Sequence, residues 1–188
     1  MQNFQEFLEN SLQQNIKKLV PLTGGASADI NRIILENNNE LIVRRSLSKE
    51  QSVMAVPKKL EAKIQRIVRS NDAPVPEIIF EFSEDEDIGE GYVMEAIPGE
   101  TIPRKILRDD KYKNVRSKLS FEIGRSLATI HQTKLDELTD LDSVTFEESL
   151  KKLYLVYSSF EQPQPVFELA FKWLETQELT KYDNVLVN

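Results

Sequence analysis

The most informative part of this sequence is Val20-Pro-Leu-Thr-Gly-Gly-Ala-Ser-Ala-Asp-Ile-Asn-Arg-Ile-Ile-Leu-Glu36, which continues through Asn37-Asn-Asn39 into Glu40-Leu-Ile-Val-Arg-Arg45. It predicts strands around a glycine loop, with basic residues at the far end. Glycines let a backbone approach a ligand without a side chain in the way. The backbone N–H groups of 25–28 and the hydroxyl of Ser27 are donors suited to phosphate. A cation two strands along can meet negative charge under the loop, so the stretch favours a phosphate-bearing ligand.

The two arginines at the end of this stretch cannot both face the ligand, because successive side chains of a strand point to opposite faces. A one-residue change of register exchanges them, so the residues alone leave open whether Arg44 or Arg45 is the one. The alternative is that both arginines are simply solvated at the end of the strand. Glu61 lies at the edge of the apolar stripe of a predicted helix, where its carboxylate could hold the arginine in a bidentate pair. An exposed helix glutamate is the alternative.

Composition narrows the class of protein. The 188 residues carry a formal net charge of −7, with 31 acidic and 24 basic side chains. This balance argues against generic binding to nucleic acid or to anionic membrane, both of which favour a basic surface. The sequence has no cysteine, which excludes disulfides, zinc–thiolate sites and thiol catalysis. Its first residues lack the basic and apolar segments of a secretory signal, so we expect a soluble cytoplasmic protein.

Hydrophobic patterning divides the chain into two parts. In the first part, we expect strands at 19–23, 30–36, 40–45, 78–82 and 92–95 and helices at 3–14 and 57–70. Asn37-Asn38-Asn39 predicts a tight turn, because asparagine tolerates positive φ and bonds its own backbone. After Pro98-Gly99 the apolar residues recur at helical spacing within 115–130, 150–157 and 166–174. The predicted domains are an N-lobe at 1–95, a hinge at 96–100 and a partial helical C-lobe at 101–188.

The predicted hinge is the third candidate for ligand contact. Tyr92-Val-Met-Glu-Ala-Ile-Pro-Gly99 is an apolar strand that runs into Pro-Gly between two regions of different structural class. Extended backbone there could offer a carbonyl and an N–H group to the edge of a purine. A plain linker is the alternative.

The order of these motifs resembles the aminoglycoside phosphotransferase/choline kinase-like family, and most nearly its branch related to the domains fused to acyl-CoA dehydrogenases. The resemblance rests on Leu22–Ser27, Ile42–Arg45, Glu61 within Lys59–Lys63, Val75-Pro76, Tyr92–Glu95 with Pro98-Gly99, and Ile123–His131. It implies an α+β, protein kinase-like fold. A β-meander N-lobe with a helix would be followed by the helical start of a truncated C-lobe.

The resemblance also implies roles for individual residues. Gly24, Gly25, Ala26 and Ser27 would cover the phosphates. Arg44 stands where the family usually has the nucleotide-pairing lysine, and Glu61 would be its helix partner. The Glu95 carbonyl and the Ile97 N–H would contact adenine, with Met94 and Ile42 lining the pocket. Arginine differs from lysine in its permanent charge and larger head, but an Arg-Arg pair is what this branch leads us to expect.

The catalytic loop of the family, His-Gly-Asp-x-x-x-x-Asn, does not occur in the 188 residues. The single histidine is His131, for which packing or capping at a helix end is the simpler interpretation. Tyr182–Asn188 resembles the strand that leads into the loop. Asp183 and Asn184 precede that strand with the wrong spacing, so we assign no catalytic residue and no metal ligand.

The leading hypothesis is therefore the N-terminal part of an ATP-dependent small-molecule phosphotransferase with a hydroxyl acceptor and Mg²⁺, inactive as this chain alone. Nucleotide and the small-molecule acceptor are the expected partners. The alternative is a non-catalytic nucleotide-binding or interaction module, a pseudo-kinase remnant. An unrelated α+β domain is the third possibility, and the acceptor and the choice between ATP and GTP stay open.

Overall fold

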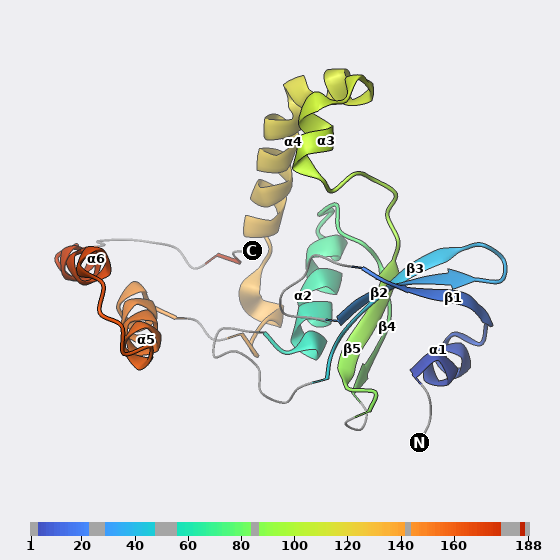
Figure 1. Cartoon of the computed structure of the whole chain (residues 1–188), viewed down its shortest axis with the longest axis horizontal. Coiled ribbons are helices and arrows are strands. Elements are labelled where there is room, and N and C mark those ends of the chain that lie inside the picture. Colours follow the sequence, from blue (N-terminus) through green and yellow to red (C-terminus); the bar gives the residue numbers. More distant parts are fainter. Residues whose placement is uncertain are drawn as a thin grey trace. The chain divides into compact units, whose positions relative to one another are not determined.

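The computed structural model describes residues 4–22, 29–47, 56–83, 87–141, 144–177 and 185–186 (Figure 1). The chain forms two compact units: Met1–Leu138 with Leu186–Asn188, and Thr139–Val185. This division falls inside the predicted C-lobe, and the boundaries at 95 and 100 stay predictions. The glycine loop, Gly24–Ser27, lies outside the described residues, as does most of the predicted final strand.

The first unit is built on a five-stranded antiparallel sheet. Its strands are β1 (Ile16–Pro21), β2 (Asp29–Leu35), β3 (Glu40–Ser46), β4 (Ile78–Ser83) and β5 (Glu90–Glu95), in the order β1-β2-β3-β5-β4. The predicted meander is confirmed, although β1 begins three residues before the predicted Leu19. Pro21 ends an edge strand, where its missing N–H is tolerated. The register also shifts within β1 and within β4.

The turn between β2 and β3 forms as the asparagines predict. Asn38 has a φ of 62°, and the Asn39 backbone N–H donates to the Asn37 side-chain oxygen at 2.9 Å. This turn fixes which residues of β3 face which side of the sheet, because Ile33 pairs with Leu41 and Ile30 with Arg44.

Two helices lie against opposite faces of the sheet, α1 (Phe4–Leu12) and α2 (Lys58–Ser70) (Figure 1). Leu8 of α1 is fully buried in the main hydrophobic core with Ile33, Val43 and Val93. On the α2 side, a smaller cluster contains Ala62, Ile78, Tyr92 and, partly buried, Met94. The alternation along β3 and β5 therefore sends one set of side chains to α1 and the other to α2.

Two glycines allow close approach at the start of β5. Gly89 has a φ of +81°, a region that side-chain-bearing residues rarely adopt. Gly91 lies opposite Arg45, and a Cβ there would stand 2.5 Å from the Arg44 carbonyl oxygen and 2.6 Å from Phe82 Cζ. The β3–β5 ladder at the two arginines thus depends on the missing side chain.

Helices make up the remainder of the described chain. The first unit continues with α3 (Pro103–Arg108), the short η1 (Asp110–Tyr112), α4 (Lys113–His131) and the short η2 (Leu135–Glu137), and the second unit contains α5 (Phe146–Ser159) and α6 (Pro165–Glu175). The sequence predicted α4, α5 and α6 but not the six-residue α3. No residue of α4 is buried. No helix among the described residues has the length and apolarity to cross a membrane.

The second unit is a helical pair closed by aromatic side chains. Thr145 and Glu148 form a reciprocal capping box at the start of α5, as the Thr-x-x-Glu spacing favours. Tyr154 and Tyr157 of α5 contact Phe171 of α6 at ring-centroid distances of 5.0 and 5.3 Å. The Tyr157 hydroxyl also accepts from the Gln164 backbone N–H at 2.7 Å, which holds the connection between the two helices.

Candidate functional site

The Glu61 carboxylate is the centre of a polar cluster on the α2 face of the sheet. Arg44 binds it in a bidentate manner, with Nε 3.1 Å from Oε2 and Nη2 3.2 Å from Oε1. Lys58 Nζ lies 3.1 Å from Oε1, and the Tyr92 hydroxyl donates to Oε2 at 3.3 Å. Each carboxylate oxygen thus has two partners, which is the full acceptor capacity of an ionised carboxylate.

Local structure places each member of this cluster. Arg44 and Tyr92 are direct neighbours across β3 and β5, so both side chains leave the sheet on the same face. Glu61 and Lys58 are three residues apart in the first turn of α2, a spacing that puts helical side chains together. The Glu90 carboxylate of β5 accepts from the Lys59 backbone N–H at 2.7 Å. This bond ties the N-terminus of α2 to the sheet.

The cluster changes the acidity of its members. Burial alone would raise the pKa of Glu61, but hydrogen bonds and charge from Arg44 and Lys58 outweigh it and lower that pKa. Burial would lower the pKa of Arg44, yet Glu61 holds it above its usual value. Burial and the nearby Glu61 charge raise the pKa of Tyr92 to about 12. Glu61 is therefore ionised and Tyr92 protonated at neutral pH.

Arg45 lies on the opposite face. Its Nε is 2.8 Å from Asp29 Oδ2, and its guanidinium carbon stands 3.6 Å from the centroid of the Phe4 ring. Its Nη1 also donates to the Ile88 carbonyl at 3.4 Å. All these partners belong to the α1 side of the sheet or to the turn before β5. Arg44, and not Arg45, therefore meets Glu61, and which of the two faces a ligand stays a prediction.

The other predicted contacts lie along the same part of the sheet. Ile42 is opposite Met94 in the β3–β5 ladder, on the face that carries Arg44. Glu95 ends β5, where its backbone N–H donates to the Glu77 carbonyl at 2.9 Å. Ile97 is 57% exposed, and within the described residues its backbone N–H has no hydrogen-bond partner.

The structure thus brings together Ile42, Arg44, Glu61 and Met94 on one sheet face, with Glu95 and Ile97 following Met94. It gives no placement for Gly24, Gly25, Ala26 or Ser27. Sequence reasoning missed Lys58, Glu90 and Tyr92. The i, i+3 spacing to Glu61 was a usable signal for Lys58. The others depend on pairing between distant parts of the chain.

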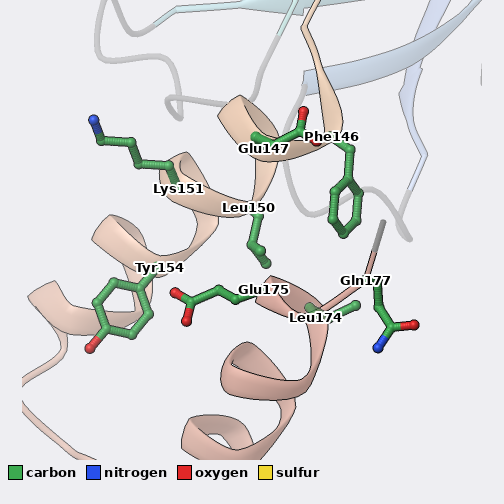
Figure 2. A pocket seen from close by; sticks show the side chains of 8 residues that line it. All are labelled: Phe146, Glu147, Leu150, Lys151, Tyr154, Leu174, Glu175 and Gln177. Atoms are coloured by element: carbon green, nitrogen blue, oxygen red, sulfur yellow. The ribbon is translucent and has the colours of Figure 1, made fainter. Parts of the chain in front are cut away.

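A cavity of about 390 Å³ lies elsewhere, between α5 and α6 in the second unit (Figure 2). Phe146 and Leu150 extend from α5 toward α6, whereas Lys151 extends away (Figure 2). The cavity is lined by Phe146, Glu147, Leu150, Lys151, Tyr154, Leu174, Glu175 and Gln177. It contains none of the residues predicted to bind nucleotide. The described part of the chain contains no group of three or more acidic or histidine side chains that could hold a metal ion.

Comparison with known proteins gives one family. Residues 18–187, nearly the whole chain, match the model of the phosphotransferase enzyme family. No curated protein matches the chain with significant similarity. The matched range begins within β1. It includes the rest of the sheet, the polar cluster around Glu61 and all the later helices.

Proposed function

The chain belongs to the phosphotransferase enzyme family and has its kinase-like α+β fold, and on that premise we propose that its α2 face binds ATP. In the intact enzyme, this ATP would give its γ-phosphate to a hydroxyl group of a small molecule, with Mg²⁺ as cofactor. The observation that carries the proposal is the bidentate Arg44–Glu61 pair between strand and helix. A cation held in this way is positioned in advance for phosphate oxygens.

The geometry of the pair leaves donors for a ligand. Arg44 has five N–H groups and uses two of them on Glu61; within the described residues, Nη1 has no partner. The guanidinium fork suits bidentate contact with phosphate. Glu61 therefore fixes the orientation of Arg44 while the outer edge of the guanidinium stays available to the α- and β-phosphates.

The adenine would lie at the other end of the same face. Ile42 and Met94 offer apolar side chains opposite one another, and the Ile97 N–H, which has no partner within the described residues, would donate to the purine edge. Gly24–Ser27 would cover the phosphates from above, as a backbone rich in N–H donors.

Transfer of the phosphate needs a catalytic loop and ligands for Mg²⁺. The sequence has no His-Gly-Asp motif, and among the described residues no carboxylate cluster fits Mg²⁺. We therefore assign no step to the metal, and we propose that these 188 residues bind nucleotide without transferring phosphate. Electrostatic stabilisation of the transferred group dominates this chemistry, which is why binding alone gives little rate.

Calorimetric titration of the 188-residue chain with ATP tests the proposal. We expect saturable binding that Glu61→Ala weakens about tenfold, because loss of the carboxylate releases Arg44 from its position. Glu77→Ala is the matched control, since Glu77 is an exposed carboxylate whose side-chain partner is Arg69. Absence of ATP binding by the wild type would refute the nucleotide site. ATP-dependent phosphorylation by the chain itself would refute the statement on transfer.

A further inference from the structure

Lys58 is a buried lysine that shares the Glu61 carboxylate with Arg44. It is the first residue of α2, and its side chain is only 7% exposed. Lysine is seldom buried to this extent unless it is paired. The one ion-pair partner that the described residues give Lys58 is Glu61, and Arg44 occupies the same carboxylate in a bidentate manner.

Two cations share one carboxylate by direct contact in this cluster. Arg44 and Lys58 contribute two positive charges, and Glu61 contributes one negative charge. Tyr92 is uncharged at neutral pH, since its pKa is raised to about 12. The Glu90 carboxylate adds a second negative charge to this region, but it accepts from the Lys59 backbone N–H at 2.7 Å and, within the described residues, forms no ion pair with Lys58 or Arg44. Each cation therefore has only a share of Glu61 by direct contact, and an anion bound to Lys58 would give each cation its own partner.

The position of Lys58 adds to this preference for an anion. α2 is 13 residues long, and the N-terminus of a helix carries partial positive charge, although its Lys59 N–H is already bound by Glu90. The lysine ammonium has three N–H donors, of which one is directed to Glu61. Arg44 makes its own two bonds to Glu61, so the carboxylate would keep a partner if Lys58 turned on its flexible stem to a second anion.

We propose that Lys58 is a second phosphate-binding residue, which contacts the polyphosphate of a nucleotide beside Arg44. This inference rests on the proposed nucleotide site and adds to it a cation from the helix. A polyphosphate carries several negative charges, so two separate cations match it better than one. In this arrangement Lys58 exchanges the Oε1 atom of Glu61 for a phosphate oxygen, and the carboxylate remains with Arg44.

The test compares Lys58→Met with Lys59→Met in the 188-residue chain. The two lysines are adjacent on α2 and the substitutions remove the same charge, but the Lys59 side chain is exposed. Each variant is titrated calorimetrically with ATP and with adenosine, which shares the base and ribose but has no phosphate. We expect Lys58→Met to weaken ATP binding about tenfold and to leave adenosine binding within about twofold. Lys59→Met should change neither by more than about twofold.

Lys58→Arg serves as the second variant, in case Lys58→Met disturbs folding. It retains the charge, so we expect it to recover most of the ATP affinity. Equal ATP affinities for wild type and Lys58→Met would overturn the role of Lys58 while leaving the nucleotide site intact. An equal loss for ATP and adenosine would also overturn it, because it would indicate a purely structural effect. If wild type binds neither ligand, the proposed function itself fails, and the role of Lys58 fails with it.

Discussion

The two faces of the sheet in the first unit use similar residues for different purposes. On the α1 face, Leu8, Val43 and Val93 are fully buried in the hydrophobic core. Arg45 is enclosed there by Asp29, Phe4 and backbone carbonyls. On the α2 face, Arg44 meets a carboxylate that is shared with Lys58 and Tyr92. The Arg45 side chain is 13% exposed and bonded through Nε and Nη1, whereas the Arg44 side chain is 26% exposed and, within the described residues, its Nη1 has no partner.

Residue type alone therefore does not determine what each arginine contacts. Alternation along β3 sends adjacent side chains to opposite faces, and each face then decides what the cation contacts. The α1 face should therefore govern stability, and the α2 face should govern binding. Four sets of variants test this separation, in order of decreasing expected effect.

Leu8→Ala should have the largest effect, because it removes a fully buried side chain from the α1-face core. Deletion of this kind costs about 3 kcal/mol of unfolding free energy. Denaturant titration followed by amide hydrogen exchange of β2 and β3 would measure it, since those amides report on the first unit. Leu107→Ala on α3, where the side chain is 65% exposed, is the control and should cost less than about 0.5 kcal/mol. Equal losses for the two variants would contradict the assigned core.

Arg44→Met and Arg45→Met should separate binding from stability. We expect Arg44→Met to weaken ATP binding about 30-fold, or about 2 kcal/mol, because it removes the oriented cation. Arg45→Met should lower the unfolding free energy by about 1.5 kcal/mol through loss of the Asp29 pair and the Phe4 contact. Its ATP affinity should stay within about threefold of wild type. Calorimetry and denaturant titration on both variants measure the two quantities, and the reverse pattern would show that the faces are assigned wrongly.

Glu61 should make the stability of the α2 face depend on pH. Burial acts to raise its pKa in the folded chain, but Arg44 and Lys58 lower that pKa below the ordinary value of a glutamate carboxyl. Such a group stabilises the fold above its unfolded pKa, and the contribution disappears as pH falls through the folded pKa. We expect Glu61→Gln to be less stable than wild type by about 1 kcal/mol at pH 7, and by less at pH 3. A difference in unfolding free energy that stays constant between these pH values would argue against an ionised Glu61 as the source.

Tyr92→Phe should have the smallest effect. It removes one hydroxyl that donates to Glu61 at 3.3 Å and keeps the ring packed against Ala62 and Ile78. Arg44 and Lys58 still hold the carboxylate, so we expect a loss of about 0.5 kcal/mol in unfolding free energy and less than threefold in ATP affinity. A loss of ATP binding as large as that of Arg44→Met would mean that Tyr92, rather than the ion pairs, positions Glu61.

Much of this arrangement could be predicted from local sequence. The order of the strands and helices followed from periodicity and turn residues, and the positive φ of Asn38 followed from residue type. The pairing of Glu61 with a strand arginine was also foreseen. The residues alone left open the choice between Arg44 and Arg45, because one residue of register exchanges them, and only the family resemblance pointed to Arg44. In the fold, Asp29 and Phe4 enclose Arg45 on the other face, and Arg44 lies beside Glu61.

The features that sequence reasoning missed depend on contacts between distant segments. Glu90 meets the start of α2 across 31 residues of chain, and nothing near Glu90 marks it as a helix cap. Gly91 is needed because Arg45 and Phe82 come together beside it, and a single glycine in a strand does not reveal its neighbours. Local patterns predict elements well, but the fit between elements depends on the whole fold.

The irregular register of the two outer strands has a consequence for association between molecules. Exposed strand edges offer unpaired N–H and C=O groups to any other extended chain, and bulges, lysines and proline are the usual protections. β1 combines a register shift with Lys17, Lys18 and Pro21, and β4 has a register shift between Ile78 and Phe80. Both borders of the sheet are thus poor templates for a sixth strand, which protects the chain against edge-to-edge aggregation.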